Sequence, residues 1–286
     1  MFPISNNDSS NQQLIERFQQ EIGIDAFNRA KREISPDTGV VLTKWPNMMR
    51  FFPATETGWI LEDDSTYFEP NGIMERDWTF DKDDNSRITV WVFVSNGSTP
   101  DDLLSMLAQF GVMTSKLNAY KLGPADLGNI SIMTNDEEPY IDDVFWVNQN
   151  VLIKISRRDS TIDVLSVAYS INNFLNQNIS SDISTKGPRI TNIAISPHKP
   201  KVNETISLKL HTASESDALH LLGPGLENTD EEIFDIQEQN KLTIKLKITK
   251  AGTYEIPMWV ADKLTLLSTR IVTQITVLPH DKSNDH

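Results

Sequence analysis

Hydrophobic positions between residues 144 and 175 change from strand spacing to helix spacing within one short stretch. Residues 144–156 are rich in β-branched and aromatic side chains, which suit a half-buried strand, and Asn148-Gln149-Asn150 interrupts them as a tight turn would. Ser160 and Asp163 then form the pattern of a capping box. Apolar residues after it recur at helical spacing, at positions 164, 168, 171 and 175. The stretch predicts a hairpin followed by a helix that packs on the sheet.

The same two periodicities organise much of the chain before this stretch. Residues 11–34 predict a helix with a break near Gly23. Residues 87–94 are apolar on both faces, which is typical of a central strand. Thr99-Pro100-Asp101-Asp102 has the N-cap, proline and acidic residues that begin a helix. Together these patterns predict an α+β fold, with helices on one face of a mainly antiparallel sheet.

Residues 37–80 lack either periodicity and predict short strands and turns. Aromatic residues are dense here, including Trp45, Trp59 and Trp78. Large aromatic side chains most often fill a core, and that is the favoured interpretation. The alternative is that the rings line a groove for a sugar or a peptide.

Helical periodicity disappears after residue 188. Strand-like runs with turn residues between them occupy Ile190–Ile195, Thr205–His211, Leu219–Leu222, Leu242–Ile248, Thr253–Val260 and Ile271–Leu278. About seven short strands in this length predict a β-sandwich. Ala251-Gly252-Thr253-Tyr254 resembles the Gly-x-Tyr corner before a late strand in immunoglobulin-like modules, and Ile256 stands where antibody domains have a cysteine. The resemblance is to the bacterial, disulfide-free kind of module, and it implies a fold without functional residues.

These changes in pattern predict the domain organisation. The predicted parts are residues 1–80, an N-terminal helix and aromatic segment that belong with the first domain; 81–179, the α+β layer; 180–188, a polar linker; 189–279, the immunoglobulin-like sandwich; and 280–286, a tail. The sequence leaves open whether residues 1–80 form a unit of their own.

Negative charge is concentrated before residue 189. Residues 1–188 hold 15 Lys+Arg and 27 Asp+Glu, a net charge of −12, whereas residues 189–286 hold 11 and 13, a net charge of −2. Phosphate backbones would be repelled, so we expect no nucleic-acid partner. An acidic surface can attract a basic partner, although solubility alone is the simpler explanation.

Residue types exclude several kinds of chemistry. The chain has no cysteine, and its five histidines all lie after residue 188, so the first domain cannot hold a thiolate nucleophile, a Ser-His-Asp triad or a His/Cys zinc site. Nucleotide-binding glycine motifs are missing. We therefore predict no cofactor and no metal site.

Membrane and export signals are also missing from the printed sequence. No apolar run reaches the roughly 18 residues of a membrane span, and residues 1–10 lack the pattern of a signal peptide. These observations leave the compartment unknown. The resemblance of the last third favours an extracytoplasmic location, periplasmic or secreted, over a cytoplasmic one.

Carboxylates are the chemistry that remains. Asp81-x-Asp83-x-Asn85 matches the first ligand positions of a calcium-binding EF-hand loop, but Ser86 and Val92 replace the glycine and glutamate that the loop requires. Paired carboxylates can also hydrolyse glycosidic bonds. No catalytic residue is assigned, and the candidate ligand-binding residues are Trp59, Glu62, Asp64, Glu69, Trp78 and Asp81.

The sequence predicts a non-catalytic binding protein, of bacterial envelope or secreted type, whose partner is another protein or a glycan. One alternative is a carboxylate-dependent glycan hydrolase or glycan-binding protein, which needs two acids about 5–10 Å apart across an aromatic-lined cleft. Another is an acidic inhibitor of a basic partner, which needs a contiguous acidic face.

Overall fold

The computed structural model forms two compact units. It describes residues 9–68, 72–95, 100–112, 120–134, 141–158, 162–213, 218–222, 234–240 and 242–279. The first unit comprises Met1–Tyr67 and Glu75–Ile183, and the second comprises Phe68–Met74 and Ser184–His286. Each unit has its own sheets.

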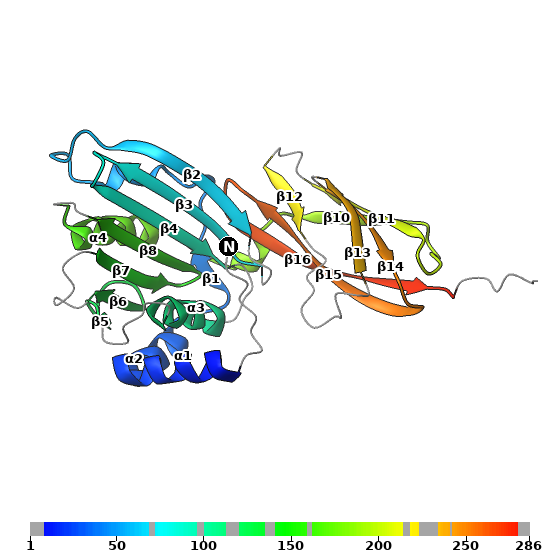
Figure 1. The fold of residues 1–286 in the computed structure, drawn as a ribbon, viewed down its shortest axis with the longest axis horizontal. Helices are drawn as coiled ribbons and strands as arrows, with labels where there is room; N and C mark the ends of the chain where they lie inside the picture. Colours follow the sequence, from blue (N-terminus) through cyan, green and yellow to red (C-terminus); the bar gives the residue numbers. More distant parts are fainter. Residues whose placement is uncertain are drawn as a thin grey trace, which may run out of the picture. The chain divides into compact units, whose positions relative to one another are not determined.

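A seven-stranded sheet forms the centre of the first unit (Figure 1). Its strands, in spatial order, are β2 (Ile60–Phe68), β3 (Met74–Asp81), β4 (Arg87–Val94), β8 (Val151–Arg158), β7 (Ile141–Asn148), β6 (Ile130–Thr134) and β5 (Tyr120–Leu122). The pairs β4–β8, β8–β7, β7–β6 and β6–β5 are antiparallel. Among the described strands, β2 and β5 lie at the two edges of this sheet.

The centre of this sheet agrees with the apolar patterns. β4 lies between β3 and β8, and its residues are buried apart from Arg87 and the partly exposed Trp91. β7 and β8 form the predicted hairpin: Asn148 pairs with Val151 across a two-residue turn, in which Gln149 has a φ of 53°. The predictions of a central strand and of this hairpin are confirmed.

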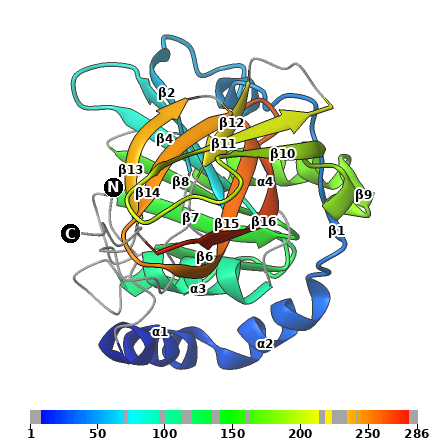
Figure 2. The same cartoon turned by 90° about the vertical axis from the view of Figure 1, so that its right-hand side faces the viewer.

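In the residues that the structure describes, four α-helices flank the sheet. They are α1 (Ser9–Ile22), α2 (Ile24–Glu33), α3 (Pro100–Val112) and α4 (Val164–Asn176). α1 and α2 meet at Gly23, whose φ of 143° produces the predicted break. Figures 1 and 2 both show α1 and α2 next to α3, and these two helices also contact β5 and β6 at the margin of the sheet.

The helices pack on both faces of the sheet, where the sequence predicted one. Phe110 of α3 contacts the rings of Phe93 and Phe145 at 5.2 and 5.8 Å. Asn172 of α4 accepts a hydrogen bond from Asn148. Phe145 and Asn148 are three positions apart in β7, so their side chains point to opposite faces. The α+β class is confirmed, and the second layer arises because the central strands are apolar on both faces.

The start of α4 differs from the predicted capping box. The Asp163 carboxylate accepts a hydrogen bond from the Leu165 amide, so Asp163 is the N-cap and the helix begins at Val164. Ser160 lies outside the described residues. An aspartate can cap a helix by itself, and this explains the shorter helix. The predicted apolar face is confirmed, because positions 164, 168, 171 and 175 are all buried.

Residues 37–80 contain more regular structure than their pattern predicts. β1 (Thr38–Val40) pairs with β9 (Ile179–Ser181), and a short 3-10 helix forms at Met48–Phe51 (η1). A second 3-10 helix, η2 (Ile183–Thr185), follows β9. The long strands β2 and β3 follow η1. The first five residues of β2 are all exposed, so β2 lacks the alternation by which a half-buried strand is found.

The tryptophans of this segment lie in the core, as the favoured interpretation expected. Trp45, Trp59 and Trp78 are all buried. The Phe52 ring packs edge-on against Trp59 and Phe80, with centroids 5.9 and 5.1 Å apart. Burial of these large rings holds β3 to the segment before β2.

The second unit contains two antiparallel sheets. One has the order β10 (Ile190–Ser196), β11 (Thr205–Thr212), β14 (Thr243–Ile248), β13 (Phe234–Asn240), and the other has the order β12 (Leu219–Leu222), β15 (Gly252–Asp262), β16 (Leu267–Val277). Side chains from both sheets, such as Leu208, Leu246, Met258 and Ile275, form one core. The predicted β-sandwich is therefore present. β13 was not singled out in the sequence, because its residues are mostly polar.

A tyrosine fixes the corner between β14 and β15. The Tyr254 hydroxyl donates a hydrogen bond of 2.9 Å to the Lys250 carbonyl, four residues upstream. Gly252 at this corner has a φ of 157°. After β10 the chain makes a parallel bridge from Lys201 to Leu278, which follows β16.

None of the helices in the described ranges is both long enough and apolar enough to cross a lipid bilayer.

Candidate functional site

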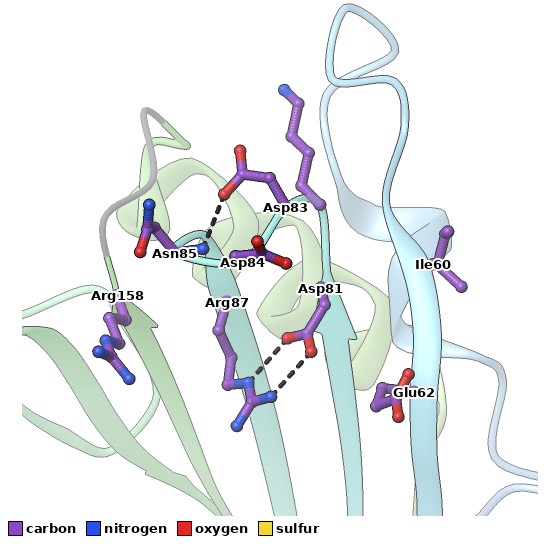
Figure 3. A pocket seen from close by; sticks show the side chains of 9 residues that line it. Ile60, Glu62, Asp81, Asp83, Asp84, Asn85, Arg87 and Arg158 are labelled. Carbon is purple, nitrogen blue, oxygen red and sulfur yellow. Dashed lines mark hydrogen bonds and ion pairs between the residues drawn. The ribbon is translucent and has the colours of Figure 1, made fainter.

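An open hollow of about 440 Å³ lies where β3 turns into β4 in the first unit (Figure 3). Its lining includes Ile60 and Glu62 of β2, the residues of the β3–β4 turn, and Arg158 of β8. Most of the lining side chains are charged. The hollow is therefore suited to a polar or charged partner rather than to a buried apolar ligand.

An ion pair occupies one side of this hollow. The Asp81 carboxylate accepts two hydrogen bonds from the Arg87 guanidinium, from Nε at 2.7 Å and from Nη2 at 2.8 Å (Figure 3). These hydrogen bonds and the positive charge hold the pKa of Asp81 below its ordinary value. Asp81 consequently stays ionised and is a poor proton donor.

The Asp83 carboxylate closes the turn between β3 and β4. It accepts hydrogen bonds from the backbone amides of Asn85 and Ser86, at 3.0 and 2.7 Å, and from the Ser86 hydroxyl at 3.2 Å. These bonds lower the pKa of Asp83. The Asp81-x-Asp83-x-Asn85 motif is thus an Asx-type turn. Within the described ranges, no three metal-ligating side chains gather as a metal site would require.

The six candidate ligand-binding residues are divided between the surface and the core. Glu62 and Asp81 both line the hollow. Asp64 instead pairs with Arg76 through two hydrogen bonds of 2.8 and 2.9 Å. Trp59 and Trp78 are buried, and Trp78 has no exposed surface. Glu69 lies outside the described residues. The structure therefore brings together two of the acids and places neither tryptophan in the lining.

The strand β2 carries two of the candidate residues, Glu62 and Asp64, but the sequence patterns did not identify it as an edge strand. Ile60 is 67% exposed, Leu61 is 37% exposed and Tyr67 is 45% exposed. Between these apolar residues lie the exposed acids Glu62, Asp63 and Asp64. β2 stands at the margin of the sheet and borders the hollow. The signal in the sequence was an acidic triplet inside a strand-length run, but that pattern also fits an ordinary turn.

Asp77 of β3 carries a further carboxylate close to these acids. Burial raises the pKa of Asp77, and the negative charges of Asp63 and Asp64 raise it further, although a backbone hydrogen bond opposes them. In the part of the chain that the structure describes, its Oδ1 is buried without a hydrogen-bond partner. Burial first, and the neighbouring negative charges second, therefore disfavour ionisation of Asp77.

A lysine surrounded by aromatic rings lies under α3. Lys154 Nζ is 4.6 Å from the centroid of the Trp91 ring, 5.1 Å from that of Phe145 and 5.7 Å from that of Phe110. Burial lowers the pKa of Lys154, and the charge of Asp143 opposes this shift. An amine with a lowered pKa can act as a nucleophile, but this one does not line the hollow. Cation–π contacts and packing account for its position.

Asp143, whose charge acts on Lys154, forms hydrogen bonds with residues of the neighbouring strands. It accepts hydrogen bonds from the Tyr120 hydroxyl, at 2.9 Å, and from the Ser156 hydroxyl. The Thr134 hydroxyl donates to its carbonyl at 3.1 Å. The sequence signal for this cluster is a single lysine within an apolar strand. The partners of that lysine lie in elements distant along the chain, so no local pattern connects them.

Comparison with known proteins does not indicate a function for this site. No model of a known protein family matches the chain, and no curated protein matches it. Any function must therefore be argued from the side chains.

Proposed function

We propose that this is a non-catalytic binding protein and that β2, with the adjoining hollow, is its recognition surface. The observation that carries the proposal is the long, unpaired outer edge of β2. This strand has nine residues, and in the described part of the chain it pairs with β3 alone. Its acids and apolar side chains are exposed together, as in a binding surface.

The two margins of the sheet differ in a way that supports this proposal. Natural proteins shorten, cover or otherwise protect edge strands, because an open edge can pair with another chain. β5, at the opposite margin, has three residues in the part of the chain that the structure describes, which resumes at Tyr120. β2 is three times as long and exposes Ile60, Leu61 and Tyr67. Its acids discourage pairing with acidic strands and leave the edge open to a partner of opposite charge.

The hydrolase alternative has less support. A glycan hydrolase needs one carboxylic acid that keeps its proton and a second carboxylate that acts as nucleophile or base. In the hollow, Arg87 keeps Asp81 ionised, and the turn engages both oxygens of Asp83. Asp77, whose pKa is raised, is not part of the lining. The tryptophans that would stack on a sugar are buried.

We also propose that the second unit is an immunoglobulin-like module. Its strand orders, β10-β11-β14-β13 and β12-β15-β16, correspond to the A-B-E-D and C-F-G sheets of constant-type immunoglobulin domains. The hydrogen bond from Tyr254 to the Lys250 carbonyl corresponds to the tyrosine corner of that fold. Modules of this kind serve as spacers or adhesion domains, which fits a bacterial envelope or secreted protein, but this functional step is an analogy of fold.

Affinity capture with the full-length chain tests the binding proposal. The wild-type protein is compared with the Glu62→Lys/Asp63→Lys variant, and Glu255→Lys, an exposed strand acid of the second unit, is the matched control. We expect one stoichiometric partner at moderate salt, lost by the β2 variant and kept by the control. Equal capture by all three proteins, or capture of nothing, contradicts the proposal. Glycan cleavage that is lost in Asp81→Asn would favour the hydrolase.

A further inference from the structure

We infer that the outer edge of β2 binds an extended peptide segment with basic side chains at its centre, which adds to the sheet as a further strand. The inference rests on the proposed function and names the chemistry of the partner. An exposed strand edge offers a row of backbone N–H and C=O groups, and an extended peptide can satisfy them while its side chains set the specificity.

The charge of β2 selects a basic occupant. Glu62, Asp63 and Asp64 are consecutive, so their carboxylates point alternately to the two faces of the sheet. An added strand therefore meets negative charge on both of its faces, where opposite charges stabilise a cross-strand pair. The surroundings are acidic too, since residues 60–87 hold nine acidic and three basic residues, a net charge of −6.

Partners within the unit leave part of this charge uncompensated. Asp64 pairs with Arg76, and Asp63 accepts hydrogen bonds of 2.9 Å from the Ser65 hydroxyl, which carries no charge. In the described ranges, the Glu62 carboxylate forms no hydrogen bond or close ion pair, although its charge acts on the Arg87 guanidinium across the hollow. A lysine or arginine beside Glu62 and Asp63 would therefore gain interactions without displacing an existing ion pair.

Apolar side chains bracket the acids. Ile60 and Leu61 precede the triplet, and Tyr67 follows it. An incoming strand with apolar residues at its ends would cover these exposed side chains, which adds favourable burial to the backbone hydrogen bonds. The expected peptide pattern is thus apolar ends around two or three central basic residues.

The same charges disfavour two other occupants. If β2 of a second copy paired antiparallel to this strand along its whole length, Asp64 would lie opposite Asp64, and like charges in opposite positions are destabilising. A nucleic-acid backbone would be repelled by them as well. A basic peptide is the occupant that gains from both the backbone edge and the charge.

Titration of the full-length protein with synthetic nine-residue peptides tests the inference. The basic peptide has valine or leucine ends and three central lysine or arginine residues, and a second peptide has glutamate in their place. Two further peptides carry backbone N-methyl groups on the odd or on the even residues of the basic sequence. Strand addition places alternate amides toward β2, so one methylated set should weaken binding at least about tenfold while the other is tolerated.

The protein variants locate the binding edge. We expect Glu62→Lys/Asp63→Lys to weaken binding of the basic peptide by at least about tenfold and Glu255→Lys to leave it unchanged. Circular dichroism and the melting temperature verify that each variant is folded. Equal binding of both methylated peptides would overturn strand addition, and no binding of the basic peptide would overturn the inference. If capture still identifies a partner that depends on β2, the proposed function survives this failure; if capture fails too, both are wrong.

Discussion

β2 and β4 belong to one sheet and lie two strands apart, yet they occupy opposite environments. β4 is buried along nearly its whole length by layers on both faces, whereas β2 is exposed over most of its length. Both strands have an extended backbone, so the difference in burial comes from their side chains and from their positions in the sheet. An uninterrupted apolar run produces a scaffold strand, and an acidic triplet between apolar residues leaves an edge available to a partner.

This comparison separates the expected effects of mutation. Changes in the β4–β8–β7 part of the sheet should reduce the free energy of unfolding, because they leave cavities or unpaired buried groups. Changes along β2 and the β3–β4 turn should alter binding with little effect on stability.

The largest expected effect is a cavity in the scaffold. Ile153→Ala, at a fully buried position of β8, should reduce the free energy of unfolding by about 4 kcal/mol. Ile60→Ala, the matched change on β2, should alter it by no more than about 0.5 kcal/mol. Urea denaturation measures both. A similar loss in the two variants would contradict the division between scaffold and edge.

The buried polar cluster comes next. Asp143→Ala should lower the free energy of unfolding by about 3 kcal/mol, because the Tyr120 and Ser156 hydroxyls lose their acceptor and Lys154 loses a nearby negative charge. Tyr120→Phe removes the hydrogen bond from the Tyr120 hydroxyl to Asp143 and should cost about 1 kcal/mol. Thermal and urea denaturation provide the comparison. An Asp143 variant as stable as the wild type would show that the cluster contributes nothing.

Asp77→Asn should stabilise the protein at neutral pH, by up to about 1 kcal/mol. The folded-state pKa of Asp77 is raised above its unfolded value, so ionisation destabilises the fold, and this penalty grows as the pH rises through the interval between the two values. The variant's advantage should therefore shrink on acidification and vanish below the unfolded pKa of about 3.9. Melting temperatures across pH 3–7 measure it. A constant advantage at all pH values would point to another cause.

A smaller effect is expected from the ion pair at the hollow. The pKa of Asp81 is lowered in the folded state, so its contribution is present above the unfolded pKa and is lost as the pH falls through the folded one. Because the pair is exposed to solvent, Asp81→Asn should cost no more than about 0.5 kcal/mol at pH 7, and less in high salt. A cost of several kcal/mol would place this pair with the scaffold.

Calcium should have no effect on stability. The Asp83 oxygens are already bound to backbone amides of the turn, and the motif lacks the glycine and glutamate of a calcium loop. Addition of about 1 mM calcium should leave the melting temperature unchanged. A rise that disappears in Asp83→Ala would show that the turn is a calcium site after all.

Local patterns predicted those parts of the fold in which periodicity and burial coincide. The β7–β8 hairpin, the break at Gly23 and the apolar face of α4 depend on neighbouring residues, so they could be found in the sequence. β2 was missed because an edge strand that is exposed on both faces has no periodic signal.

Long-range pairing limited the prediction of the site. Arg76 and Asp64 lie twelve residues apart, and Asp143 and Tyr120 lie 23 apart. Whether such residues meet depends on strand register, which the sequence does not state. Acids predicted as ligands are therefore partly engaged by arginines, and two tryptophans predicted as ligands lie in the core.

Residue-resolved hydrogen exchange on the full-length protein tests most directly whether the edge of β2 is open. Without a partner, alternate amides of residues 60–67 should exchange rapidly, whereas the amides of β4 should be strongly protected. The basic peptide should slow those alternate β2 amides and leave β4 unchanged. Uniform, β4-like protection along β2 in the absence of peptide would contradict the account, because it would mean that the edge is already covered.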